Sequence, residues 1–243
     1  MNQKRNKIFI AGGQRLRAIK AKLQQATKVG TTPLQIDDLA EKLITKKGDS
    51  PSFKTVPGYH HTTCINRNEE MLHGLPNNVP FKKGDVVTID LGLVHQGYHL
   101  DTSFTFQIPP TDKKTQFFLK TGQKALKNAI SKAKPGNSVY DISLAMQKGV
   151  ESKGFSVSTQ MVGHGIGRKL HQDPQIPCFA CSLSKKKILK QGQTLAIEVM
   201  YAQEKADLIT APDGWTLKTK DNSLSAMFEE SVLITPKGSQ ILT

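Results

Sequence analysis

Two segments that lie far apart in the chain each end in a carboxylate that could bind a metal ion. KKGDVVTID (82–90) and KQGQTLAIE (190–198) align without a gap: each opens with lysine and glycine at a turn, continues as an alternating strand and ends in a carboxylate after isoleucine. Alternate side chains of a strand share a face, so Asp90 and Glu198 point away from the apolar faces of their strands. This weak internal repeat predicts equivalent positions for both carboxylates beside one cleft.

A third carboxylate, Asp101, lies in the strand-like segment HLDTSFTF (99–106), whose alternating pattern does not require it. Gln96-Gly97 is the kind of x-Gly pair that closes a β-hairpin. A hairpin centred there without a bulge pairs Asp90 with Ser103 and places Asp101 two residues along on the same face. We therefore expect the carboxylates of Asp90 and Asp101 to reach one point, whereas a register shift of one residue would turn Asp101 away.

Further candidate ligands occur later in the chain. Glu229 and Glu230 lie in the alternating segment SAMFEESVLIT, His164 lies between glycines, and His171 and His73 are two further histidines. Each pair of like charges at about 4 Å costs roughly 4 kcal/mol at an effective dielectric near 20, so converging carboxylates need basic side chains or cations between them. Single histidines are more often structural than ligands, but an acidic cleft with a nearby histidine is the ligand set of a two-metal site.

Helices and strands that would position these residues follow one another in blocks. The spacing of apolar residues predicts helices over 12–28, 32–48, 111–136 and 138–155, each ending near glycine or proline. Such helices typically cover one face of a sheet in an α+β fold. We expect residues 1–243 to form a single domain, and without an apolar run of about 20 residues or a secretory signal we expect a cytoplasmic protein and no membrane insertion.

Charge and cysteine content give weaker indications. The net charge of +14 indicates an anionic partner, with ribosomal RNA as the first candidate. Because no helix-turn-helix, zinc finger or RNA-binding aromatic signature occurs and charge runs are usually only solvated, we favour a solvated basic face over such a partner. Cys178 and Cys181 form a C-x-x-C without a second cysteine pair, so we expect a loop with two free thiols rather than a zinc or redox site.

In combination, these motifs resemble type I methionine aminopeptidases over nearly the whole chain. They occur in the order C-x-x-x-N-E-x-x-x-H-G-L-P, G-D-x-V-x-I-D with a second aspartate eleven residues on, G-H-G-I-G, I-E-x-M, D-G-W-T-x-K-T-K-D-x-S-L-S-A and F-E. Aminopeptidase P and prolidase share the ligands but normally have an extra N-terminal domain, for which we expect no room here. Type II methionine aminopeptidases have a sizeable insertion that this sequence lacks.

The resemblance implies a pita-bread fold, in which helices cover a pseudo-two-fold antiparallel sheet, and this would account for the repeat. It implies two divalent metal ions, which could be Mn, Fe(II), Co or Zn, with Asp101 and Glu229 bound to both. The implied ligands are Asp90, Asp101, His164, Glu198 and Glu229. The implied enzyme is a cytoplasmic, monomeric metalloprotease that removes the N-terminal methionine from peptides and nascent proteins, preferentially before a small second residue.

The resemblance also assigns roles around the metals. Glu198 would carry the proton, His171 would steady the developing oxyanion and His73 would hydrogen-bond to the peptide. A methionine pocket would include Tyr59, Cys64 and Trp215, with Phe53 and Leu170 as neighbours. Trp215 and Cys64 could instead be ordinary core residues.

Several positions depart from the family pattern. Val199 replaces a usual proline, Glu230 a usual histidine and Leu170 a usual aromatic residue, and YHHTTCINRNE (59–69) lacks the usual proline after tyrosine and serine after cysteine. We expect an altered rate or pocket shape, and a fifth carboxylate, Glu230, near the metals that shifts metal preference. Two other classes stay open: a non-enzymatic binding protein on this fold, which would lack ligands, and a nucleic-acid or ribosome binder that retains the site.

Overall fold

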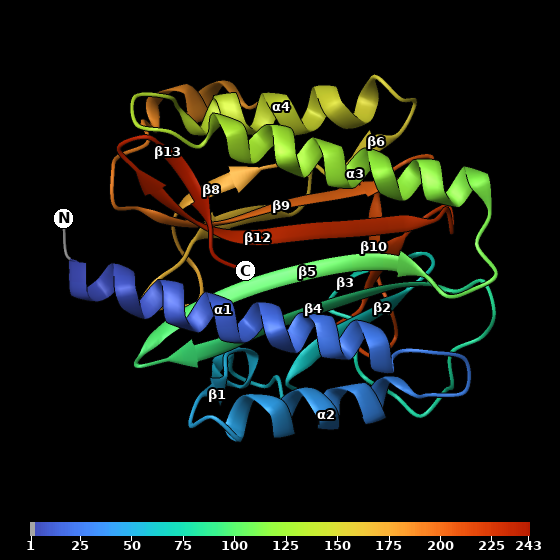
Figure 1. Ribbon diagram of the computed structural model, residues 1–243. Coiled ribbons are helices and arrows are strands. Elements are labelled where there is room, and N and C mark those ends of the chain that lie inside the picture. Colours follow the sequence, from blue (N-terminus) through green and yellow to red (C-terminus); the bar gives the residue numbers. More distant parts are fainter. Residues whose placement is uncertain (1–2) are drawn as a thin grey trace.

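A computed structural model describes residues 3–243 and shows one large sheet with helices packed on one of its faces (Figure 1). The helices are α1 (Gln3–Ala26), α2 (Pro33–Thr45), α3 (Lys113–Lys132) and α4 (Val139–Glu151), with short 3-10 helices η1 (Phe53–Thr55) and η2 (Ser182–Lys186). The strands are β1 (Ser50–Pro51), β2 (Thr63–Arg67), β3 (Glu70–Leu72), β4 (Val86–His95), β5 (Tyr98–Gln107), β6 (Ser156–Val157), β7 (Val162–Gly165), β8 (Gln172–Pro177), β9 (Thr194–Ala202), β10 (Leu208–Thr210), β11 (Leu217–Thr219), β12 (Ser225–Thr235) and β13 (Gly238–Ile241).

The large sheet joins two similar halves through its central strands. Its order is β1-β4-β5-β12-β9-β7-β8, while β2, β6 and β13 pair with β4, β9 and β12. A second, three-stranded sheet has the order β10-β11-β3. Every pairing between described strands is antiparallel. β12 follows β9 in sequence but lies between β9 and β5, so it connects the halves.

Each half has its own helices and core. α1 packs on β4 and β5, whereas α3 packs on β9 and β12 (Figure 1). The predicted repeat also recurs in its turns, because Gly84 and Gly192 both adopt positive φ, of 82° and 88°. Their amides donate to the carbonyl oxygen of Ile108, directly after β5, and to that of Ile234 in β12. The repeat is therefore structural, and the α+β class with a pseudo-two-fold antiparallel sheet is confirmed.

The first helix begins earlier than its apolar spacing predicts. α1 starts at Gln3 rather than at residue 12, and the pair Gly12-Gly13, which resembles a helix start, lies inside it. A Cβ at Gly12 would lie 2.6 Å from Leu100 Cδ1, and one at Gly13 would meet the carbonyl group of Leu242. The glycines therefore allow close packing of α1 on the sheet, which outweighs their low helix propensity.

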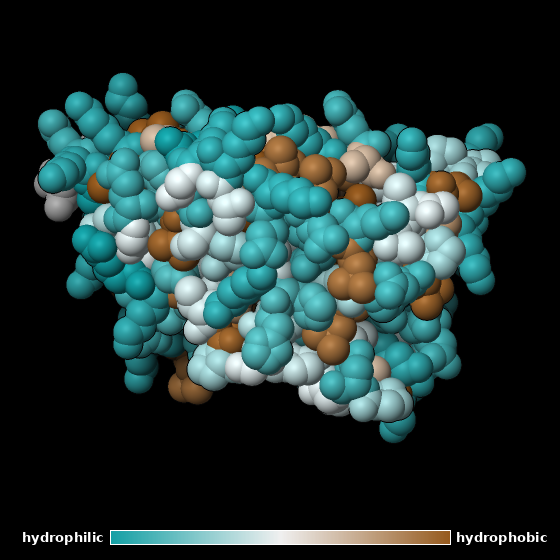
Figure 2. Space-filling view, turned by 90° about the horizontal axis from the view of Figure 1, so that it is seen from below, coloured by the Kyte–Doolittle hydropathy of each residue, from teal (hydrophilic) through white to brown (hydrophobic). Residues whose placement is uncertain are grey.

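The outer surface on the side of α2 is largely hydrophilic. Figure 2 shows this side from below, with hydrophobic residues in separate spots among hydrophilic ones. Within the described chain, no helix combines the length and the apolar character needed to cross a membrane.

Candidate metal centre

Acidic side chains form a row across the sheet on the face opposite the helices. Direct pairing connects Cys64 with Asp90, Asp90 with Ser103, Ser103 with Glu229, and Glu229 with Glu198. Residues that pair directly have Cα atoms about 4.5 to 5.5 Å apart and point to the same side. Three carboxylates from both halves of the fold therefore lie in one line.

Asp101 and His164 complete the cluster from neighbouring positions. The predicted hairpin register is confirmed: Gln96 and Gly97 form the turn, both with positive φ, and Asp101 lies two residues from Ser103 on the same face of β5. His164 on β7 pairs with Ala196, two residues before Glu198. One ligand atom each of Asp101, His164 and Glu229 lie within 4.8 Å of one another.

Burial of so many acids raises their pKa values. Burial raises the pKa of Asp101 to about 7. Burial and the nearby charges of Asp101 and Glu198 also raise the pKa of Asp90 and that of Glu229, and burial followed by Asp101 raises the pKa of Glu198. All four carboxyl groups are less than 10% exposed. Without cations, this cluster must retain protons.

The cluster fits divalent cations on its own chemistry. Buried polar atoms normally have hydrogen-bond partners, but Asp90 Oδ1 and Glu229 Oε1 are buried without one among residues 3–243. The donor set is oxygen-rich with one imidazole, which suits first-row divalent metals and selects none of them. The unpartnered oxygens and the raised pKa values both indicate that positive charge is needed there.

His164 is oriented for ligation by its neighbours. Its Nδ1–H donates to the carbonyl oxygen of Gly165 at 3.0 Å, which leaves Nε2 as the acceptor that a metal needs. Burial and His171 lower the pKa of His164 to about 4, so the ring is neutral near pH 7. A Cβ at Gly163 would lie 2.7 Å from the Ala196 oxygen, so the flanking glycines allow the close approach expected from the sequence.

Hydroxyl groups fix the backbone that carries the acids. Ser231 Oγ accepts from the Asp101 amide at 3.0 Å and donates to the Asp101 carbonyl oxygen at 2.8 Å. The Thr102 hydroxyl donates to the Glu229 carbonyl oxygen at 2.9 Å, and the Thr102 amide donates to Asp101 Oδ1 at 3.0 Å. Asp101 and Glu229 are thereby tied together across the β5–β12 boundary.

All five metal-ligand candidates line one cavity of about 190 Å³. The cavity also contains the other predicted site residues, His73, His171, Tyr59, Cys64, Trp215, Phe53 and Leu170. Sequence reasoning missed four further lining residues, Val56, Leu72, Met161 and Val162, because nothing in their spacing distinguishes them from core residues.

Aromatic residues form the apolar end of this cavity. The Tyr59 hydroxyl donates to the Thr63 carbonyl oxygen at 2.7 Å and lies 3.2 Å from Cys64 Sγ. Tyr59 and Trp215 meet edge to face, with ring centroids 5.1 Å apart. Burial, followed by the charge of Asp90, raises the pKa of the Cys64 thiol, so this thiol stays neutral beside the acids.

The two remaining histidines lie beside the acids. The ring of His171 meets that of His164 edge to face at 4.5 Å between centroids. His73 has a φ of 55°, an uncommon conformation for a residue with a side chain, which often marks a functional site. Burial, followed by the charge of His171, lowers the pKa of His73, and burial also lowers the pKa of His171. Both imidazole rings can therefore act as neutral hydrogen-bonding groups.

Glu230 does not lie near the metal positions, which contradicts the sequence-based expectation. Alternation along β12 turns it to the helix face, where Lys20 Nζ donates to it at 2.9 Å and the Thr243 hydroxyl at 2.6 Å. Adjacent residues of a strand point to opposite faces, so only Glu229 can join the acidic row. A shift of metal preference by Glu230 is therefore not supported.

The C-x-x-C cysteines lie after strand β8. Cys178 and Cys181 are both free, and Cys178 is completely buried. Its thiol donates to the Glu198 carbonyl oxygen at 3.4 Å, and burial raises its pKa to about 12. Cys178 thus packs beneath the strand that carries Glu198, as a neutral thiol.

The sequence and the fold are similar to those of known proteins. The sequence matches metallopeptidase family M24 over residues 8–236. It is 38% identical to a methionine aminopeptidase of Clostridium perfringens over 221 residues, which cover 91% of this chain and 88% of that protein. It is 40% identical to a methionine aminopeptidase of Escherichia coli K12 over 187 residues, which cover 76% and 70%.

Solved structures of other proteins match the fold of this chain over its whole length. A methionine aminopeptidase of Thermotoga maritima superposes with a TM-score of 0.96 at 35% identity and covers 100% of this chain and 98% of that one. A prolidase of Pyrococcus horikoshii superposes with a TM-score of 0.77 at 22% identity and is covered to 62% of its length. The second likeness concerns the fold alone.

Proposed function

This chain belongs to metallopeptidase family M24, and on that basis we propose which role each site residue has in the removal of an N-terminal methionine. The protein is a metal-dependent methionyl aminopeptidase with two divalent metal ions. The observation that carries the proposal is the row of buried carboxylates, with unpartnered oxygens, that both halves of the sheet contribute to one cavity. Because neither half holds the cavity alone, we treat residues 1–243 as a single catalytic domain.

Five residues that line this cavity would hold the metals: Asp90, Asp101, His164, Glu198 and Glu229. Asp101 and Glu229 would serve both ions, and the hydroxyl groups that tie these two residues together support this role. When bound, the ions polarise the peptide carbonyl and lower the pKa of the attacking water.

Glu198 transfers the proton of the attacking water. Its carboxylate accepts a proton from the attacking water and delivers it to the leaving amine, so that one water is added and one peptide bond is broken. Cys178 and the ladder to β12 keep the Glu198 backbone in place.

The remaining cavity residues bind the substrate. Tyr59, Cys64 and Trp215 surround the methionine side chain, with Phe53 and Leu170 beside them. His171 steadies the oxyanion and His73 hydrogen-bonds to the peptide near the cleaved bond. Both histidines are less buried than the acids, so they lie toward the mouth of the cavity and crowd a large second residue of the substrate. The preference for a small second residue follows from this crowding.

Nascent chains in the cytoplasm are the natural substrates, and the enzyme acts as a monomer. The charge of +14 supports association with ribosomes through the basic surface. This association supplies nascent N-termini and is independent of the chemistry in the cavity.

Peptide cleavage tests the proposal. The Mn²⁺-loaded enzyme should release methionine from Met-Ala-Ser and not from Met-Lys-Ser, as measured by chromatography of free methionine. Asp90→Asn, which removes one ligand charge without changing side-chain size, is the matched control and should lose this activity. Equal release from both peptides would contradict the assigned crowding, and no release from either would contradict the assigned activity.

A further inference from the structure

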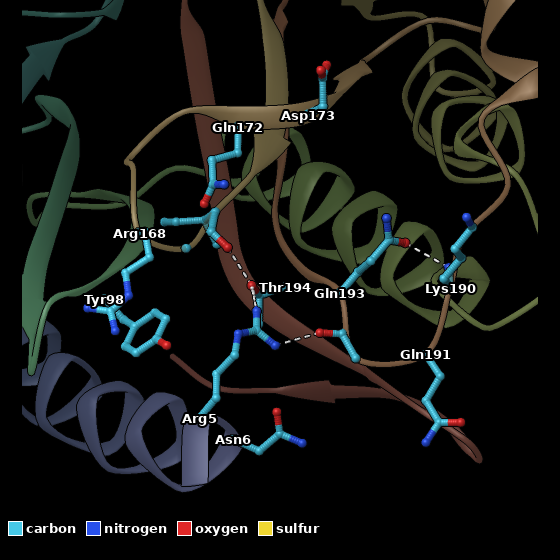
Figure 3. A pocket seen from close by; sticks show the side chains of 13 residues that line it. Arg5, Asn6, Tyr98, Arg168, Gln172, Asp173, Lys190, Gln191, Gln193 and Thr194 are labelled. Carbon is cyan, nitrogen blue, oxygen red and sulfur yellow. Dashed lines mark hydrogen bonds between the residues drawn. The ribbon is translucent and has the colours of Figure 1, made fainter. Parts of the chain in front are cut away.

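A larger, basic hollow lies outside the metal-binding cavity. It has a volume of about 610 Å³ and lies where the first turn of α1, the loop after β7 and the turn before β9 meet (Figure 3). Its cations are Arg5, Arg168 and Lys190. Thr194, at its inner wall, is four residues before Glu198 on β9, which corresponds to about 13 Å along a strand. This hollow is therefore separate from the catalytic cavity.

Arg5 is held in a fixed position at the inner wall. Its guanidinium donates to the Gly192 carbonyl oxygen at 2.6 Å and to Thr194 Oγ1 at 2.7 Å (Figure 3). Asn6, beside it, is only 8% exposed, and its Oδ1 has no hydrogen-bond partner among the described residues. A cation and an unsatisfied polar group thus lie together at the base of the hollow.

Arg168 and Lys190 contribute positive charge to this hollow. The Arg168 guanidinium stacks 4.1 Å from the centroid of the Tyr98 ring and donates to the Gly97 carbonyl oxygen. Within the described part of the chain, no carboxylate forms an ion pair with Arg168 or Lys190. Asp173 is the one acid that lines the hollow, and its carboxylate points away from the cations in Figure 3.

Two adjoining hollows extend this surface into a groove. One, of about 350 Å³, shares Arg5, Tyr98 and Arg168 and adds Lys4. The other, of about 610 Å³, shares Asp173, Lys190 and Gln193 and adds Lys186 and Lys187. We call the three together the basic groove; its cations are Lys4, Arg5, Arg168, Lys186, Lys187 and Lys190. A compact anion needs one such hollow, whereas a line of them matches an extended polyanion.

We propose that the basic groove binds the sugar-phosphate backbone of single-stranded RNA. Lysine and arginine contacts to successive phosphates supply most of the affinity for such a chain and require no sequence signature. The outer plane of Arg168, already stacked on Tyr98, offers a surface on which an unpaired base can stack. The inference deepens the proposed ribosome association and rests on it only for the source of the RNA.

Binding of a short fluorescent oligouridylate to the full-length enzyme tests the groove directly. Arg168→Gln with Lys190→Gln should weaken binding by about tenfold and should reduce the slope of log affinity against log salt by roughly 1.4, about 0.7 for each lost phosphate contact. The matched control is Lys120→Gln with Lys124→Gln, which removes the same charge from exposed positions of α3 and should change affinity far less. Fluorescence anisotropy at several salt concentrations measures both quantities.

Several outcomes would overturn the inference. Equal losses in the two double variants would mean that general surface charge attracts RNA, and complete competition by millimolar AMP would mean that one phosphate suffices. Lys187→Gln with Lys190→Gln provides a second groove variant in case loss of the Arg168 stack disturbs folding. Release of methionine from Met-Ala-Ser should stay unchanged in all variants, so failure of the groove is distinguishable from failure of the peptidase assignment.

Discussion

Removal of the metals should make the stability of this enzyme fall as the pH rises. Burial raises the pKa of Asp101 to about 7 and also raises those of Asp90, Glu198 and Glu229. An unfolded chain releases these protons near pH 4, whereas the folded metal-free protein keeps them to higher pH. The folded state then binds more protons than the unfolded state, so the free energy of unfolding decreases with pH over this interval.

The magnitude follows from the shift at Asp101. Its pKa of about 7 exceeds the ordinary value of 3.8 by about three units, and each unit corresponds to about 1.4 kcal/mol. Asp101 alone should therefore lower the free energy of unfolding by roughly 4 kcal/mol between about pH 4 and pH 7. Because a whole domain is stable by only about 5 to 15 kcal/mol, the effect should be large.

Urea unfolding with a chelator, from about pH 5 to pH 8, measures this dependence. Excess Mn²⁺ should flatten it, because adjacent cations favour the ionised carboxylates. Asp101→Asn removes the titrating carboxyl group at position 101. The metal-free variant should therefore be more stable than the metal-free wild type above about pH 7. A free energy of unfolding that is constant or rises with pH in the metal-free protein would refute the reasoning, as would a dependence that Mn²⁺ leaves unchanged.

Three other substitutions give separate expectations. Glu198→Gln should lower kcat for Met-Ala-Ser by about 100- to 10,000-fold because it removes the proton carrier, and an unchanged rate of methionine release would contradict that role. Glu230→His should leave the Mn²⁺ affinity measured by calorimetry unchanged but lower the free energy of unfolding by roughly 1 to 3 kcal/mol, since Lys20 and Thr243 lose an acceptor; altered Mn²⁺ affinity would place Glu230 on the metal side. Gly163→Ala should destabilise the fold by roughly 1 to 3 kcal/mol, because its Cβ would lie 2.7 Å from the Ala196 oxygen; an unaltered melting temperature would show that β7 can move away.

Local sequence rules predicted the positions of three of the site carboxylates well. The turn at Gln96-Gly97 fixes the register of β4 and β5, and strand alternation then brings Asp90 and Asp101 to one face. The alignment of 82–90 with 190–198 placed Glu198 at the corresponding position of the other half. These inferences succeeded because each depends on neighbours within one hairpin or one strand.

Other features depend on contacts between distant segments and could not be predicted from local pattern. The insertion of β12 between β5 and β9 decides that Glu229 joins the row and that Glu230 meets Lys20 instead. The early start of α1 depends on its close approach to Leu100, which is possible because Gly12 has no Cβ. Met161 and Val162 reach the cavity only because β7 packs beside β9.

The central position of β12 has a consequence for biosynthesis. β5 and β9 are both translated before residues 225–235, yet each of them pairs with the strand that these residues form and not with the other. A growing polypeptide shorter than this lacks the seam between its halves and the Glu229 carboxylate. A chain truncated before residue 225 should therefore lack peptidase activity, because one proposed metal ligand and the strand that joins the two halves are both missing.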